Sequence, residues 1–255
     1  MKYYEQLLSM GCFSWEELCE VVGNESTAHT LAYRYVKQGY ISRVRRGLYV
    51  ALDLLTKSSS VNKYRIASKI SEESYVSHYS AFEYFGLQNQ VSYVVNVSSD
   101  TPFAKFDFEG NTYLCISSRL PQGVTQLSDG VRITDIERTI LDGINDFDKV
   151  IGLEELLRCL SLVPSLDEQR LLEYLSAYGK QVLYQKTGYI LEHLKSELRL
   201  SDRFFETCAA KIGESKRYLL RDSSPRDSQY YQRWRLVAPK NLMALIEGGY
   251  QDAEI

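Results

Sequence analysis

The sequence lacks the features that membrane, secreted and metal-binding proteins need. No apolar run reaches the roughly 18 residues of a membrane-spanning helix, and the start, Met1-Lys2-Tyr3-Tyr4-Glu5, is too polar for a secretory signal. The five cysteines include no Cys-x-x-Cys pair, and the three histidines stand far apart. We therefore expect a cytoplasmic protein with no membrane contact, no metal and no cofactor.

Motifs of the common nucleotide-binding and hydrolytic enzymes are also missing, because Gly-x-x-x-x-Gly-Lys-Ser/Thr, Gly-x-Gly-x-x-Gly, His-Glu-x-x-His and Gly-x-Ser-x-Gly do not occur. One set imitates a metal nuclease, since Asp202 is followed by Glu214-Ser215-Lys216. Such a centre needs adjacent rigid strands, whereas Asp202 is expected to open a helix and Glu214 to lie in a turn. We expect no enzymatic activity and keep a divalent-metal nuclease as an alternative.

The composition is typical of a folded chain, with 44% hydrophobic and 25% charged residues, and 255 residues are enough for two domains. The formal net charge of −3 conceals an uneven distribution. Between Ser26 and Leu52 there are five basic residues and no acid, whereas all five acids of residues 1–52 precede Ser26. We expect a positive edge on the N-terminal domain. Its basic residues are Arg34, Lys37, Arg43, Arg45 and Arg46.

Hydrophobic periodicity predicts three helices at the N-terminus. Residues 2–10 form the first, and Ser14-Trp15-Glu16-Glu17 is a capping box that opens a second helix through Val22. The third is expected from about Ser26 to Gln38, with Thr27, Thr30 and Arg34 on its polar face. The opposite, apolar face would contain Ala28, Leu31, Ala32, Tyr35 and Val36.

After Gly39, two short alternating runs around Gly47 predict a basic β-hairpin. Three helices and such a hairpin make a winged helix-turn-helix, in which the third helix enters the major groove of DNA and the hairpin, or wing, lies along the backbone or the minor groove. The same fold also serves as a protein adaptor, which stays an alternative. The candidate DNA-binding residues are Ser26, Thr27, Thr30, Arg34 and Lys37 on the helix and Arg43, Arg45 and Arg46 on the wing.

The hydrophobic period stops before the serine run at 58–60, which predicts a boundary between a domain at 1–55 and a second at 61–255. Residues 61–149 should be mixed sheet and helices, and 150–255 mainly helical. The fold class is α+β: an N-terminal winged helix-turn-helix domain followed by a larger mixed α/β domain with a helical C-terminal part.

Turn and capping signals give the elements of the second domain. We predict a helix at 78–85 capped by Ser77, and a capping box at Thr134 and Glu137 that opens a helix to about Ile144. A polar loop containing Pro225 should separate the last strands. The other predicted elements are a helix at 61–71, strands at 93–97, 105–108, 112–117, 123–127, 131–133, 217–220 and 233–237, and a helix at 241–247.

Four stretches form a recognisable set in this order along the chain. They are the wing Arg45-Arg46-Gly47-Leu48-Tyr49-Val50, the segment 75–87 with Ser77-His78-Tyr79-Ser80-Ala81, the segment 133–142 with Glu137-Arg138-Thr139, and Tyr218-Leu219-Leu220 followed by Arg233-Trp234-Arg235-Leu236. Together these stretches resemble the AbiEi antitoxins. The resemblance implies a bacterial type IV toxin–antitoxin or abortive-infection system. It implies a repressor whose N-terminal domain binds inverted repeats in double-stranded promoter DNA. It also implies that the C-terminal domain counteracts a co-encoded nucleotidyltransferase-like toxin, and it leaves open whether the two proteins touch.

The motif residues also have a structural interpretation. Ser77 can cap a helix, His78 can bond a neighbouring backbone group, and Arg138 and Asp142 are spaced to pair along one helix. A lone histidine with distant carboxylates does not define a reacting centre. We therefore expect a scaffold role for these residues rather than a catalytic one.

Overall fold

The computed structural model describes residues 2–88, 90–117, 120–220 and 227–247. The fold is mixed α+β, as predicted. The chain forms two compact units, of which the first contains residues 1–76, 92–119 and 125–133 and the second contains 77–91, 120–124 and 134–255. The predicted boundary near 55–60 thus lies inside the first unit, because residues on its two sides contact each other, as Glu17 does Lys69 and Arg45 does Phe103. Whether residues 1–55 fold alone stays a prediction.

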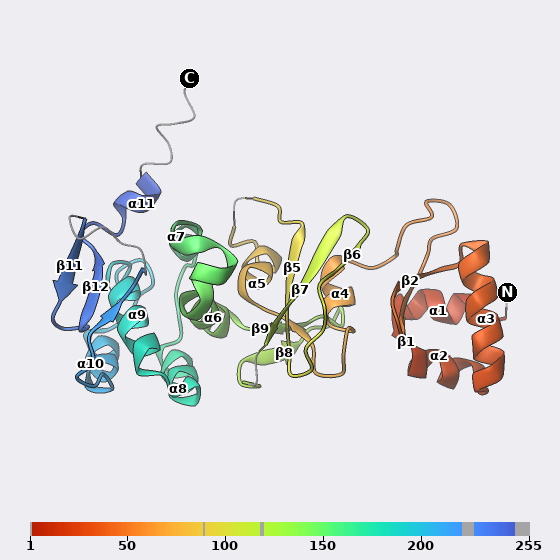
Figure 1. Cartoon of the computed structure of the whole chain (residues 1–255), viewed down its shortest axis with the longest axis horizontal. Helices are drawn as coiled ribbons and strands as arrows, with labels where there is room; N and C mark the ends of the chain where they lie inside the picture. The colour runs from red at the N-terminus through yellow and green to blue at the C-terminus, as the bar shows by residue number, and fades with distance from the viewer. Residues whose placement is uncertain (1, 89, 118–119, 221–226, 248–255) are drawn as a thin grey trace, which may run out of the picture. The chain divides into compact units, whose positions relative to one another are not determined.

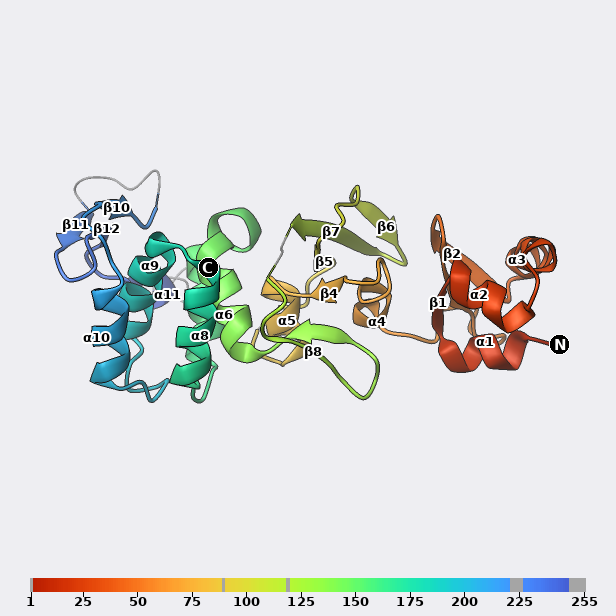
Figure 2. The same ribbon diagram turned by 90° about the horizontal axis from the view of Figure 1, so that it is seen from below.

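The N-terminal elements form the predicted winged helix. Strands β1 and β2 both pair antiparallel with β3, which gives the order β1-β3-β2. The three helices lie on one side of this small sheet (Figures 1 and 2). The bounds are α1 (Tyr4–Met10), β1 (Cys12–Ser14), α2 (Trp15–Val22), α3 (Glu25–Gln38), β2 (Ile41–Arg45) and β3 (Leu48–Ala51).

Local signals explain where these helices begin and end. The capping box of α2 is confirmed, because Ser14 Oγ accepts from the Glu17 amide at 3.2 Å and the Glu17 carboxylate accepts from the Ser14 amide at 2.8 Å. Asn24 caps α3, which therefore starts one residue before the predicted Ser26. Gly39, at a φ of 68°, ends α3 in the left-handed conformation that glycine adopts without strain.

The apolar face of α3 is buried as predicted, with one exception. Ala28, Leu31, Ala32 and Tyr35 lie in the core of the winged helix, but Val36 is 43% exposed. Val36 lies at the edge of the apolar stripe, where it lines a surface hollow described below.

A six-stranded mixed sheet has the order β6-β7-β5-β4-β9-β8. Strands β5 and β7 are parallel, whereas β6 and β7 form the predicted antiparallel hairpin. Helix α4 is shorter than the predicted 61–71, because Ser68 Oγ bonds both Tyr64 O and the Arg132 backbone as the helix ends. The bounds are α4 (Lys63–Ala67), β4 (Tyr75–Val76), β5 (Val94–Ser99), β6 (Phe106–Phe108), β7 (Asn111–Ser117), β8 (Val124–Gln126) and β9 (Arg132–Thr134).

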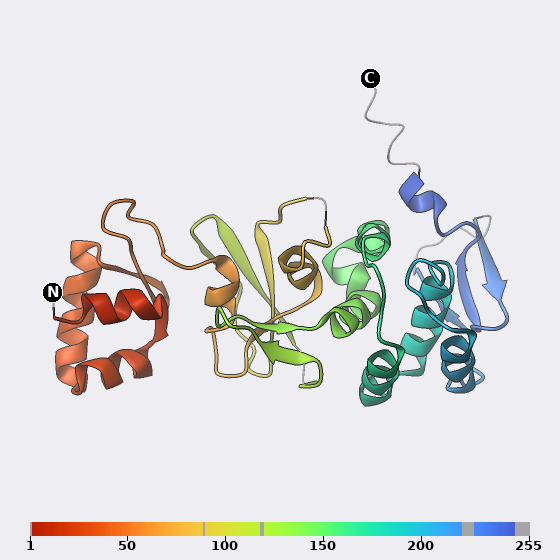
Figure 3. The ribbon, with the colours of Figure 1, turned by 180° about the vertical axis from the view of Figure 1, so that it is seen from behind.

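Helices dominate the second unit. Leucines at three- and four-residue spacing, which are typical of buried helix faces, are buried at Leu153/Leu156/Leu157/Leu160, Leu171/Leu175 and Leu191/Leu194/Leu198, whereas Leu172 is partly buried. This unit also contains a small sheet of order β10-β12-β11 (Figure 3, blue), which is followed in the chain by a short helix. The bounds are α5 (His78–Tyr84), α6 (Ile136–Val150), α7 (Gly152–Ser161), α8 (Glu168–Tyr178), α9 (Gln181–Glu192), α10 (Asp202–Ala210), β10 (Arg217–Tyr218), β11 (Ser228–Tyr231), β12 (Leu236–Pro239) and α11 (Ala244–Glu247).

One predicted helix cap was wrong, and a second is confirmed in position only. Asp135, not Thr134, caps α6, because its carboxylate accepts from the Arg138 amide at 2.9 Å while Glu137 bonds the Asp167 amide. Ser77 is the N-cap residue of α5, as predicted, but its hydroxyl lies 2.8 Å from His78 Nδ1 and makes no bond to the helix amides.

Some boundaries in the second unit also differ from the prediction. Helix α6 continues past Ile144 to Val150, with a kink at Asp146. The last strand starts at Leu236 and not at 233, because Arg235 adopts a positive φ of 45° in the preceding turn. The terminal helix is confined to Ala244–Glu247, and Pro225 lies outside the described residues. No helix in the described ranges combines the length and the apolar character needed to cross a bilayer.

Candidate nucleic-acid interface

The residues predicted to read DNA lie on the exposed face of α3. Ser26, Thr27, Thr30, Arg34 and Lys37 are all exposed. Thr30 Oγ1 donates to Ser26 O at 3.2 Å, and the Arg34 guanidinium lies 5.8 Å from the centre of the Tyr35 ring. The helix therefore presents hydroxyl groups and cations along one solvent-facing surface.

The three wing arginines have different surroundings. Arg43 and Arg46 are exposed, and Arg46 forms the turn of the hairpin with Gly47, whose φ is 80°. Arg45 is half-buried, and its guanidinium lies 5.2 Å from the Phe103 ring and 5.3 Å from the Phe106 ring. Only Arg43 and Arg46 present their charge to solvent in the way the sequence prediction assumed.

A hollow of about 520 Å³ separates α3 from the wing. The Trp15 and His29 rings meet in its wall, with their centres 4.3 Å apart, and Tyr33 is 73% exposed at its edge. Lys37 of α3 and Arg43 of β2 add two positive charges. The lining residues are Trp15, His29, Ala32, Tyr33, Val36, Lys37, Arg43 and Tyr49.

Sequence reasoning missed the aromatic members of this hollow. A signal for two of them was present, because His29 and Tyr33 are four residues apart and share the exposed side of α3 with Lys37. Trp15 and Tyr49 come from other elements, and only the fold brings them to the same place. Flat apolar rings beside two cations can hold a sugar face and its phosphates together.

Acidic groups limit where DNA can approach. Glu25 is exposed in the first turn of α3, so its carboxylate opposes the phosphate contact that a helix N-terminus otherwise favours. Glu17 is neutralised by Lys69 at 2.5 Å. Burial opposes ionisation of Glu17, but the bonds from Lys69 and the Ser14 amide hold its pKa below the usual value. The middle of α3 and the wing are thus better suited to DNA than the first turn of α3.

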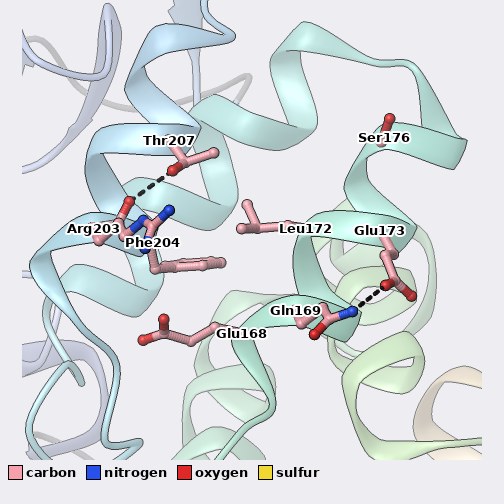
Figure 4. A pocket seen from close by; sticks show the side chains of 8 residues that line it. All are labelled: Glu168, Gln169, Leu172, Glu173, Ser176, Arg203, Phe204 and Thr207. Carbon is pink, nitrogen blue, oxygen red and sulfur yellow. Dashed lines mark hydrogen bonds between the residues drawn. The ribbon is translucent and has the colours of Figure 1, made fainter.

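A second hollow, of about 830 Å³, lies between α8 and α10 (Figure 4). Glu168 accepts from the Ser201 hydroxyl at 2.8 Å, Gln169 donates to Glu173 at 2.9 Å, and Arg203 is the one cation among the described lining residues, against two glutamates. Leu172 and Phe204 form its apolar part. The two glutamates make this hollow unsuitable for phosphates.

The Ser-His element forms a buried cluster with Asp146. Ser77 Oγ lies 2.8 Å from His78 Nδ1, and His78 Nε2 lies 3.7 Å from the Asp146 carboxylate. His78 adopts a positive φ of 53°, a strained conformation for a histidine. The Ser77 hydroxyl is buried, and neither it nor His78 lines the hollow beside α3 or the hollow between α8 and α10. A serine without access to solvent supports the scaffold interpretation over a hydrolytic one.

The Glu-Arg-Thr element anchors a loop. Arg138 is fully buried, and its guanidinium donates to Asp142 at 2.9 Å and to the carbonyls of Leu120 and Gln122 at 2.8 and 2.6 Å. The predicted pairing of Arg138 with Asp142 is confirmed. A Cβ on Gly123 would come within 2.7 Å of the Arg138 side chain, so the loop needs glycine there.

The nuclease-like residues do not have the strand geometry of a metal nuclease. Asp202 is the first residue of α10 and pairs with Lys195 at 2.6 Å. Glu214 lies in the turn before β10. Within the ranges that the structure describes, no group of three or more His, Cys, Asp or Glu side chains is arranged to hold a metal ion.

Comparison with known proteins identifies the architecture and no family. No family model matches the chain. No curated protein matches it either. Among solved structures, the crystal structure of the RV2827C protein from Mycobacterium tuberculosis matches with a TM-score of 0.64 and 13% sequence identity. The match covers 98% of this chain and 94% of that chain. At this identity the likeness shows a shared fold along nearly the whole chain.

Proposed function

We propose that this protein binds double-stranded DNA through α3 and the wing. The observation that carries the proposal is the hollow between them, where Lys37 and Arg43 flank exposed aromatic rings. A winged helix that places its third helix in the major groove leaves one sugar–phosphate backbone to pass between that helix and the wing. Cations there contact phosphates, and the rings pack against sugars.

The exposed face of α3 and the cations beside the wing would then have different roles in recognition. Thr30 and Arg34 face outward from the middle of α3, where side chains meet base edges and read sequence, whereas the Thr27 hydroxyl donates to the capping Asn24 at 3.0 Å in the first turn. Lys37, Arg43 and Arg46 supply charge to the backbone, which gives affinity without sequence preference. Arg45 contributes less, because its guanidinium lies over the Phe103 and Phe106 rings.

We further propose that the bound DNA is the protein's own promoter and that the protein acts as an antitoxin. This part rests on the resemblance of the Ser-His-x-Ser-Ala, Glu-Arg-Thr and wing sequences to the AbiEi antitoxins. The operator would contain inverted repeats, and the second unit would counteract a nucleotidyltransferase-like toxin encoded beside it.

A binding experiment tests the DNA proposal. Fluorescence anisotropy with duplexes from the region upstream of the gene should show specific binding, and Arg34→Ala should weaken it by about 1–3 kcal/mol with relaxed base preference. Lys211→Ala, which removes an exposed cation from the second unit, is the matched control. A protein that binds no duplex at low salt would be an adaptor, and nicking that requires divalent metal would favour the nuclease.

Co-expression tests the antitoxin proposal. Growth arrest by a neighbouring nucleotidyltransferase-like gene should be relieved by the full chain. It should also be relieved by Arg34→Ala, if protection acts through the second unit. Protection that disappears together with DNA binding would show that it works through repression alone.

A further inference from the structure

The small C-terminal sheet exposes two tyrosines in one row. Tyr218 of β10 and Tyr230 of β11 are both registered opposite Val237 of the central strand β12, so the three side chains cross the sheet on the same face. The two tyrosines are 56% and 48% exposed. Two tyrosines on either side of Val237 form an apolar row across this face of the sheet.

Positive charge accompanies this row. Lys216 Nζ lies 5.6 Å from the centre of the Tyr218 ring and 5.4 Å from that of Tyr230, so one cation covers both rings. Arg217 is exposed on the edge strand β10 and lines a hollow of about 750 Å³. Both features belong to the second unit and are separate from α3 and the wing.

The hollow collects cations from three elements. Lys149 comes from the end of α6, Lys186 from α9 and Arg217 from β10, and Asp148 is the one acid among the described residues that line it. Lys149 pairs with Asp146 at 2.5 Å, so Lys186 and Arg217 are the main cations of this hollow. Lys186 Nζ lies 4.5 Å from the Phe147 ring centre, which fixes this charge at the hollow wall. Tyr218 lies at the rim, so the tyrosine row and the hollow are continuous.

We propose that this surface binds a single-stranded nucleic acid. Bases stack on Tyr218 and Tyr230, and Lys216 moves from the rings to a phosphate. The backbone then follows Arg217 into the cationic hollow. Both observations are needed, because aromatic rings alone fit a protein partner equally well, whereas rings joined to several cations match a strand of bases and phosphates.

The spacing of the tyrosines favours a single strand over a duplex. Neighbouring strands lie about 4.8 Å apart, so the backbones of β10 and β11 are separated by roughly 10 Å across β12. Bases in a duplex are stacked about 3.4 Å apart and their faces are covered. Only a strand whose bases are splayed apart can place one base on each ring.

Anisotropy with the full chain and labelled 12-nucleotide single strands, oligo-dT and oligo-U, tests the proposal. We expect binding that weakens about 5- to 100-fold in Tyr218→Ala and in Tyr230→Ala. Tyr218→Phe keeps the ring and should retain the affinity. Arg217→Ala should reduce the salt dependence of binding, whereas Lys211→Ala should not.

Two further measurements separate this site from the promoter-binding surface. Arg34→Ala should bind the single strands normally, and Tyr218→Ala should bind duplex operator normally. Thermal melting verifies that each variant folds. Absence of single-strand binding at low salt, or equal affinity of the tyrosine variants, would overturn the proposal. Binding of a free mononucleotide as tight as that of the oligonucleotide would also overturn it, and so would capture of a protein by this face in place of a nucleic acid.

Discussion

Arg45 and Arg46 are adjacent on the wing, but their guanidinium groups meet different surroundings. Arg46 is exposed at the turn, whereas Arg45 lies over two phenylalanine rings of the first unit. An exposed cation near DNA releases counterions from the phosphates, which a cation on aromatic rings does not. The two side chains should therefore contribute to different properties of the protein.

We predict that Arg46→Ala weakens binding to operator and random duplex alike and lowers the slope of log affinity against log salt by about 1. Arg45→Ala should leave this slope unchanged and reduce the free energy of unfolding by about 0.5–1 kcal/mol. Salt titrations and urea unfolding of both variants check this. Equal slopes for Arg46→Ala and the wild type would remove the wing tip from the interface.

A second prediction at this scale concerns Asp146. Burial opposes its ionisation, but the neighbouring His78 ring and the Lys149 ammonium hold the pKa of this carboxyl well below its usual range. A folded-state pKa below the unfolded value gives stability that is present above about pH 4 and is lost as the pH falls further.

Asp146→Asn should therefore reduce the free energy of unfolding by about 1 kcal/mol at pH 7, a modest amount because Lys149 is largely exposed. The difference between variant and wild type should shrink as the pH falls from 5 to 3. Urea titrations across this range measure it, and a difference independent of pH would contradict the charge interaction.

At the scale of elements, the sequence predicted α3 well because the information is local. Spacing alone separates Leu31 and Tyr35 from Thr30 and Arg34, and the structure buries the first pair and exposes the second. The aromatic hollow could not be predicted in this way. It depends on Trp15 and Tyr49, which belong to α2 and β3. The packing of these elements against α3 brings the two rings to the hollow. Neither Ser77 nor Thr134 makes the predicted side-chain cap bond, because the Ser77 hydroxyl lies against His78 Nδ1 and the Thr134 hydroxyl bonds that of Thr139.

Helix α9 offers a test of packing against propensity. Gly188 lies inside this helix, and a Cβ there would come within 2.0 Å of the Trp234 ring. Alanine is the better helix former by about 1 kcal/mol, but the ring is fully buried and cannot move aside without a rearrangement. At this position, helix propensity favours alanine, whereas packing against Trp234 favours glycine.

We predict that Gly188→Ala destabilises the protein by about 1–3 kcal/mol, since overpacking exceeds the gain in propensity. Gly143→Ala in α6 is the control. Its nearest neighbour is the flexible end of Leu156 at 2.9 Å, so its cost should be smaller. Thermal unfolding of both variants and the wild type measures the two effects. A melting temperature of Gly188→Ala above that of the wild type would show that the tryptophan has room to shift.

At the scale of the whole molecule, the winged helix has a core of its own. The buried members of this core lie between Tyr4 and Ala51, and none of them belongs to the six-stranded sheet. Some contacts to later parts of the first unit stabilise it, including Glu17 with Lys69 and Arg45 with Phe103. The core supports independent folding, and the contacts add stability that a fragment would lack.

We predict that residues 1–57 fold and bind operator DNA, with a lower melting temperature than the full chain because so small a domain is marginally stable. Circular dichroism measures the folding and the melting temperature of the fragment, and fluorescence anisotropy measures its binding to operator DNA. Residues 1–57 carrying Arg34→Ala serve as the control for specific binding. A fragment that stays unfolded in the presence of excess operator would show that the later contacts are essential.

The division of the chain into two units has a consequence for how this protein can change during evolution. The backbone passes from one unit to the other five times, at 76/77, 91/92, 119/120, 124/125 and 133/134. A module joined by a single tether can be exchanged by one recombination event, but segments interleaved five times must be inherited together. The winged helix precedes the first of these passages. We therefore expect recombination to exchange the segment before about residue 60 as a block, which would give new operator specificities. The rest of the chain, with its interleaved units, should be inherited together.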